Sequence, residues 1–209
     1  MAAPATPNAP AELLARALDA TGDLVAGVRP DQWEAPTPCT GWSVRDLVNH
    51  FVGGNHMFAG ILRGGQLAPP AQAAKARSAD HLGDDPVAAY RQSGRALQDA
   101  FAQPGVLEQM FPSPVGTVPG VVVLHLRITE LLVHGWDLAR ATAQPAALPA
   151  DLAEQELLFT RGKLADIPAD RQPFAPPQPV SADAPAIDRL AAARDSQVSR
   201  LTPRRSPPS

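Results

Sequence analysis

Apolar residues recur at intervals of three and four along four long segments of this sequence, and prolines or glycines separate the segments. This spacing places apolar side chains on one face of an α-helix, whereas the period of two that is typical of strands is rare here. The segments cover about residues 9–28, 43–63, 86–103 and 119–143. The pattern therefore predicts an all-α fold.

Two of the segments begin with clear helix-start signals. Ser43 and Asp46 form an S-x-x-D capping box, whose side chains accept hydrogen bonds from the free amides at a helix N-terminus. Asp85 precedes Pro86, and this pair suits the N-cap and the first helical position. We expect helices to start at both places.

The rest of the chain carries weaker signals. We expect a shorter helix over residues 150–164, a loop or short helix over 66–82, and a small β-hairpin or irregular loop over 106–118. Residues 166–209 are rich in proline. We interpret them as an extension that packs on a domain of residues 1–165, with one short helix over 187–190 and disorder over 203–209.

Charge and cysteine content exclude several classes of protein. Eighteen basic and 21 acidic residues give a net charge of −3, which disfavours nucleic-acid and membrane-surface partners. A single cysteine, Cys39, excludes an internal disulfide and a zinc site built from several cysteines. No apolar run is long enough for a membrane span. We therefore expect a soluble cytoplasmic protein.

One group of residues suggests metal chemistry. Glu130 and His134 are four residues apart and project from one face of a helix, which Asp137 extends. His50 lies on another expected helix among apolar neighbours. Two imidazoles and one carboxylate, with a position left open for water, form a typical catalytic zinc site.

Simpler interpretations of the same residues exist. His50 would then be a core histidine bonded to a carbonyl group, and Glu130 and His134 would only bond to each other. We interpret Cys39 as a small packed thiol, Trp42 and Trp136 as core anchors, and His56 and His125 as structural or surface groups. His81 falls in a predicted loop, and Gly53-Gly54 allows close packing within a helix or the approach of a ligand. The sequence contains no G-x-G-x-x-G, Walker or G-x-S-x-G motif.

Two stretches of the sequence resemble a known family. TPCTGWSVRDLVNH at residues 37–50 and ELLVHGWDLA at residues 130–139 are similar to the two signatures of the DinB-like metal-binding helical bundles. Within these bundles they most resemble the actinobacterial branch related to the metal-binding domain of mycothiol-dependent maleylpyruvate isomerase. The resemblance covers about residues 9–165.

The resemblance implies a four-helix bundle of the up-down-down-up type, with an extra short helix and a Pro-rich C-terminal extension. It implies that His50, Glu130 and His134 bind one divalent metal ion, zinc or nickel, and that Asp137 orients a ligand. In characterised relatives the metal activates the thiol of mycothiol. The implied function is S-transfer or isomerisation of a small electrophile by such a thiol. Dimers are common among similar bundles, so the resemblance also implies a possible homodimer.

The resemblance does not extend to the second, C-terminal domain of the isomerase, so we do not expect maleylpyruvate isomerase activity itself. The alternative function is a non-catalytic metal- or ligand-binding bundle that supports a stress response.

Overall fold

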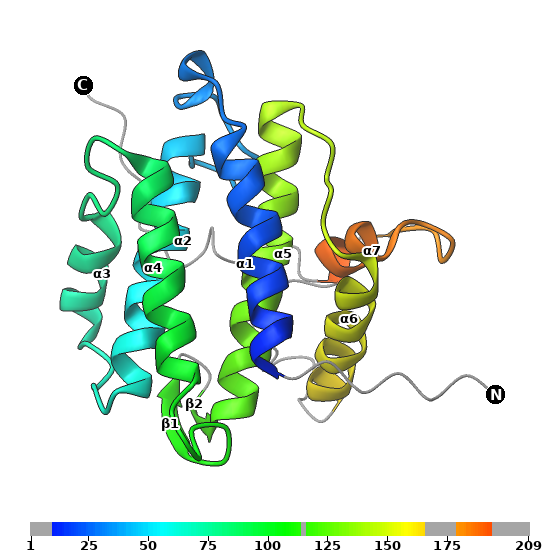
Figure 1. Ribbon diagram of the computed structural model, residues 1–209. Coiled ribbons are helices and arrows are strands. Elements are labelled where there is room, and N and C mark those ends of the chain that lie inside the picture. Colours follow the sequence, from blue (N-terminus) through cyan, green and yellow to red (C-terminus); the bar gives the residue numbers. More distant parts are fainter. Residues whose placement is uncertain (1–9, 114–115, 166–178, 194–209) are drawn as a thin grey trace.

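Four long helices pack around one another in a computed structural model that describes residues 10–113, 116–165 and 179–193. They are α1 (Pro10–Ala26), α2 (Val44–Leu62), α4 (Pro86–Phe101) and α5 (Gly120–Thr142). Helices α1 and α2 each contact both α4 and α5, so the order around the bundle is α1, α4, α2, α5. Figure 1 shows α1 and α5 running upward and α2 and α4 running downward. The expected up-down-down-up helical bundle is confirmed.

The local signals at the helix ends operate as predicted. Ser43 Oγ accepts a hydrogen bond from the Asp46 amide at 3.2 Å, and Asp46 Oδ2 accepts one from the Ser43 amide at 2.9 Å. Asp85 Oδ1 accepts from the Ala88 amide at 2.9 Å. Helix α5 ends at Ala143, whose φ of 54° lies in the left-handed region that closes many helices.

The apolar faces of the four helices meet in one core. Its fully buried members come from every helix of the bundle, among them Leu14, Leu47, Phe51, Leu97, Ile128 and Leu131. Burial of such side chains is the main favourable term in folding. Helix α5 packs against α1 and α2 and also against two further helices later in the chain, so most of its residues are buried. This leaves its polar side chains in need of partners.

Short elements connect the bundle helices. A 3₁₀ turn, η1 (Pro30–Gln32), follows α1, and α3 (Pro70–Ser78) forms where a loop or short helix was expected. Strands β1 (Met110–Ser113) and β2 (Gly116–Pro119) pair in antiparallel register, with Met110 opposite Pro119. The hairpin alternative for residues 106–118 is therefore confirmed.

Two further helices pack beside α5, on the right in Figure 1. Helix α6 (Ala150–Ala165) forms in the segment expected to be helical, and α7 (Ala186–Ala193) contains the expected short helix at 187–190. Trp136 on α5 is half-buried, and its Nε1 donates to Asp188 of α7 at 2.7 Å. The division into a domain of residues 1–165 and an extension stays a prediction, and the disorder expected over 203–209 lies outside the described residues.

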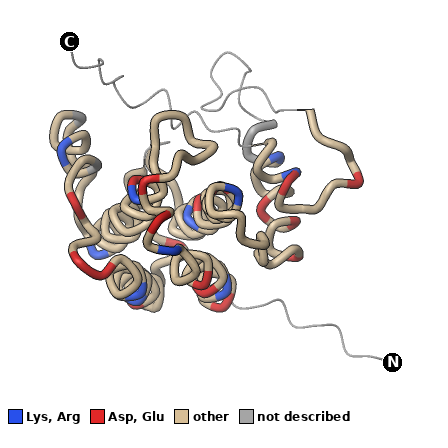
Figure 2. The backbone as a smooth tube through the Cα atoms, turned by 90° about the horizontal axis from the view of Figure 1, so that it is seen from above, with Lys and Arg blue, Asp and Glu red and all other residues tan. Residues whose placement is uncertain are grey.

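Charges are spread over the outside of the bundle. Figure 2, which looks along the helices, shows acidic and basic residues interspersed rather than gathered on one face. Within the described ranges, every helix is too short or too polar to cross a membrane.

Candidate metal centre

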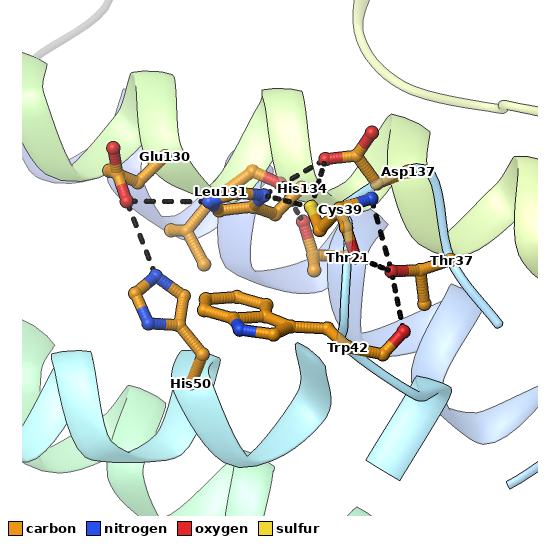
Figure 3. A network of polar contacts seen from close by, with 9 residues as sticks. All are labelled: Thr21, Thr37, Cys39, Trp42, His50, Glu130, Leu131, His134 and Asp137. Carbon is orange, nitrogen blue, oxygen red and sulfur yellow. Dashed lines mark hydrogen bonds and ion pairs between the residues drawn. The ribbon is translucent and has the colours of Figure 1, made fainter. Parts of the chain in front are cut away.

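Helices α2 and α5 bring His50, Glu130 and His134 together. Glu130 Oε2 lies 3.3 Å from His50 Nε2 and 3.6 Å from His134 Nε2 (Figure 3). One ligand atom from each of the three side chains lies within 4.8 Å of the others. The sequence predicted this group from two separate signatures, and the bundle places the signatures against each other.

The three side chains differ in exposure. His134 is 2% exposed, whereas the side chains of His50 and Glu130 are 23% and 26% exposed. Solvent therefore reaches the group from the side of His50 and Glu130. Burial lowers the pKa of His50, and the neighbouring His134 adds to this effect, while the contact with Glu130 opposes it. A lowered pKa favours the neutral imidazole, which is the form that binds metal ions.

Asp137 and Cys39 hold the other nitrogen of His134. Asp137 Oδ2 lies 2.9 Å from His134 Nδ1, and Cys39 Sγ donates to the same oxygen at 3.2 Å. A carboxylate can only accept hydrogen bonds, so His134 donates through Nδ1, and Nε2 is the nitrogen that faces Glu130. Asp137 thus fixes the orientation of the His134 ring, and its role behind a metal ligand stays a prediction.

Cys39 has a second polar neighbour. Its sulfur lies 3.6 Å from His134 Nδ1, and Cys39, His134 and Asp137 form another group with metal-binding atoms close together. All three side chains are buried. The distances from Asp137 Oδ2 to His134 Nδ1 and Cys39 Sγ are those of hydrogen bonds. We therefore interpret this second group as hydrogen-bond partners that hold His134 in place, not as a metal site.

The loop before α2 builds one wall of the site. Thr37 Oγ1 accepts a hydrogen bond from the Cys39 amide and donates to the Trp42 carbonyl at 3.0 Å. The Trp42 ring lies 5.0 Å from the His50 ring and 6.0 Å from the His134 ring, measured between centroids. Cys39 is buried and Trp42 packs against the core, as predicted, and both also lie beside the histidines of the candidate site. Both belong to the same sequence stretch as His50, and this proximity in sequence was the one indication that they lie near the site.

The donor set fits a divalent cation. Two ligands about 2.0–2.1 Å from a tetrahedral zinc ion are separated by about 3.3 Å, and the contacts of Glu130 measure 3.3 and 3.6 Å. His134 Nε2 and the Glu130 carboxylate face each other, and with a neutral imidazole they are two acceptors, which repel unless a cation lies between them. A cation between His50, Glu130 and His134 would satisfy all three side chains.

A second polar group lies on α5 away from this site. His125 Nδ1 donates to Glu156 Oε1 at 2.8 Å, and Thr129 Oγ1 donates to Glu156 Oε2 at 3.0 Å. Glu156 comes from α6 and is fully buried. His125 is therefore structural, as predicted, although its partner on α6 could not be identified from spacing.

The remaining histidines lie outside both groups. His56 is exposed, and His81 is half-buried in the loop after α3, where its amide donates to Asn49 Oδ1 at 2.7 Å.

Sequence comparison identifies relatives of the chain. The family described as mycothiol maleylpyruvate isomerase N-terminal domain matches residues 14–139, which is more than half of the chain. Two relatives, from Mycobacterium tuberculosis strains CDC 1551 / Oshkosh and ATCC 25618 / H37Rv, are each 38% identical over 178 residues. The match covers 85% of this chain and 92% of each relative, and both relatives are described as uncharacterized proteins.

Structure comparison supports the fold. The crystal structure of a mycothiol-dependent maleylpyruvate isomerase matches with a TM-score of 0.58 and 16% identity, over 71% of this chain. A histidine-to-alanine mutant of such an enzyme matches with the same TM-score and 15% identity. The chain covers 66% of each of these structures, slightly less than two thirds of their length.

Proposed function

The chain belongs to the mycothiol maleylpyruvate isomerase N-terminal domain family, and from this premise we propose that it binds one divalent metal ion through His50, Glu130 and His134. The observation that carries the proposal is the meeting of these three side chains from α2 and α5. We further propose that the protein is an S-transferase or isomerase that uses a mycothiol-type thiol on a small electrophile.

The residues of the chain have distinct roles in this proposal. Asp137 holds the Nδ1 proton of His134, so Nε2 is free for the metal. His50 is neutral near pH 7 because burial lowers its pKa. Glu130 contributes the negative charge that offsets part of the charge of a divalent ion. Zinc and nickel both suit a set of imidazole and carboxylate ligands.

The exposed side of the site is where the thiol would enter. A divalent ion held by these residues would lower the pKa of a thiol brought against it, so that the sulfur would be a nucleophile at neutral pH. His50 and Glu130 border this side, and the Trp42 ring next to His50 provides an apolar wall. Such a wall suits the carbon skeleton of a small electrophile and limits the water near it.

The alternative is a protein that binds a metal ion or a small ligand without turnover. Both functions need the same metal-binding residues, so metal content tests their common basis and turnover separates them.

Metal content is measured first, on purified protein reconstituted with zinc or nickel and then desalted. We expect one equivalent of metal in the wild-type protein and large losses in His50→Ala, Glu130→Gln and His134→Ala. His56→Ala is the matched control, because His56 is an exposed histidine on the same helix as His50. Retention of metal by all three variants would exclude the assigned ligands.

Turnover is measured on the metal-loaded protein with mycothiol and a panel of electrophiles that includes a chlorinated arene, an epoxide and an unsaturated diacid. Mass spectrometry detects the thiol adduct or the isomerised product. We expect a rate above that of buffer, and Glu130→Gln should abolish it. A metal-bound protein without turnover on the whole panel would instead support the binding function.

A further inference from the structure

Arginine 127 lies in the core of the bundle, one helical turn before Glu130 on α5. It is the largest of the fully buried side chains, with 1% of its surface exposed. A buried guanidinium needs hydrogen-bond acceptors, and an apolar side chain of similar size would be easier to accommodate there. The position of Arg127 therefore calls for an explanation beyond stability.

Arg127 bonds across to α2 beside a residue of the candidate metal centre. Its Nη2 donates to the carbonyl oxygen of Phe51 at 2.8 Å, and its Nε donates to Asn55 Oδ1 at 3.0 Å. Phe51 directly follows His50 in the chain. The planar guanidinium makes both bonds in a fixed geometry, so it fixes how α2 lies against α5 at the level of the metal centre.

Gly54 on α2 makes the space for this guanidinium. A Cβ atom at Gly54 would lie 2.7 Å from Arg127 Nη1 and 3.1 Å from Arg127 Cζ. Glycine is unfavourable inside a helix, and its presence here is explained by the close approach of Arg127. Gly54 in α2 and the buried arginine in α5 thus form one structural feature, whereas a Cβ atom at Gly53 would meet His81 instead.

The network continues to a third helix. Asn55 Nδ2 donates to Ser93 Oγ on α4 at 3.0 Å, and Ser93 Oγ donates to the Tyr90 carbonyl oxygen at 2.8 Å. Asn55 is therefore itself held in place while it accepts the bond from Arg127. This arrangement gives the guanidinium rigid partners on α2 rather than a mobile side chain.

We propose that Arg127 is a positioning residue that sets the separation of His50 from Glu130 and His134. The inference rests on the proposed function, because the group that it positions is the metal-binding group. His50 comes from α2 and the other two ligands come from α5, so the relative placement of these two helices decides whether the three ligand atoms meet. Arg127 connects the two helices at that level.

Two variants remove the contact in different ways. Arg127→Met keeps apolar packing and loses the donors, and Gly54→Ala keeps the arginine but takes its space. Gly60→Ala is the matched control, because Gly60 lies on the same helix and a Cβ atom there meets nothing within 4 Å. Leu18→Ala is a control for lost stability, because Leu18 packs against Gly94 of α4 rather than between α2 and α5.

The first measurement is the zinc dissociation constant, determined by competition with a chromophoric chelator, together with the melting temperature and the helical circular dichroism of each variant. We expect Arg127→Met and Gly54→Ala to bind zinc at least tenfold more weakly than wild type. Gly60→Ala should stay within twofold, and Leu18→Ala should melt earlier without losing affinity. Wild-type affinity in folded Arg127→Met would overturn the inference.

The second measurement is a crystal structure of metal-free Arg127→Met. We expect His50 Nε2 to have moved away from Glu130 Oε2, beyond the 3.3 Å of the wild-type protein. An unchanged contact would overturn the inference even if wild type bound neither zinc nor nickel. If wild type bound neither metal, the proposed function would fail, but the crystal structure of Arg127→Met would still decide whether Arg127 positions His50. If Gly54→Ala does not fold, Arg127→Met provides both readouts.

Discussion

Asp137 Oδ2 lies 2.9 Å from His134 Nδ1, and this contact decides which nitrogen of His134 faces Glu130. The two residues are three positions apart on α5, so the helix itself sets their spacing. Because the carboxylate accepts a hydrogen bond from Nδ1, it is Nε2 that points into the candidate metal centre.

Replacement of Asp137 by asparagine should weaken metal binding. The amide has no charge and offers donors as well as an acceptor, so it holds the Nδ1 proton less firmly. We expect zinc affinity to fall by about 10- to 100-fold, measured by chelator competition. Asp99→Asn, at an exposed position on α4, should leave the affinity unchanged. Equal affinities in the two variants would contradict the role of Asp137.

Changes at Cys39 should affect the same contact more weakly. Cys39 Sγ donates to Asp137 Oδ2 at 3.2 Å, so Cys39→Ala removes one of the hydrogen bonds of a buried carboxylate. We expect a loss of about 1–2 kcal/mol in the free energy of unfolding. Cys39→Ser keeps a donor and should lose less. Urea unfolding of the metal-free proteins provides the test, and a larger loss in the serine variant would speak against this hydrogen bond.

The metal-free protein should lose stability as the pH falls. Burial lowers the pKa of His50 below the value near 6.5 that it has in the unfolded chain. Below about pH 6.5 the unfolded chain therefore binds a proton that the folded chain takes up only at lower pH, which favours unfolding. Above that pH both states are neutral at His50, and the effect is absent.

The contribution of His50 can be isolated with His50→Gln. Urea unfolding of both proteins between about pH 7.5 and about pH 5 should show a shallower loss of stability in the variant, since the other titrating groups are shared. Parallel curves would show that the pKa of His50 is the same in the folded and unfolded chains.

Glu156 should stabilise the attachment of α6 to the bundle without affecting the metal centre. Its carboxylate accepts hydrogen bonds from His125 and Thr129 of α5 in a fully buried position. We expect Glu156→Gln to lower the free energy of unfolding by about 1–3 kcal/mol and to increase hydrogen exchange in α6, while zinc affinity stays within about twofold of wild type.

The control is Glu154→Gln on the same helix. Glu154 pairs with Arg189 of α7 at a partly exposed position, so its loss should cost less than about 1 kcal/mol. If the free energy of unfolding fell equally in the two variants, the buried hydrogen bond between Glu156 and His125 would stabilise the protein no more than the partly exposed ion pair does.

The sequence by itself predicted the helices and the three members of the candidate metal centre. The apolar spacing and the capping box at Ser43 reflect a local preference for helix. Tertiary packing left these helices in place. Glu130 and His134 share a helix face by their spacing alone, and Asp137 follows on that face. His50 was grouped with them as a histidine among apolar neighbours on another expected helix, and the resemblance of residues 37–50 to a known signature made this assignment more specific.

The tertiary structure decided the contacts between distant residues. Cys39 lies 98 positions before Asp137, and Arg127 lies 76 positions after Phe51, and no local pattern links either pair. Such contacts depend on how each helix is rotated and shifted against its neighbours, which the whole core determines together. A helix pattern identifies the face of a polar side chain, whereas its partner becomes known only when the helices are packed.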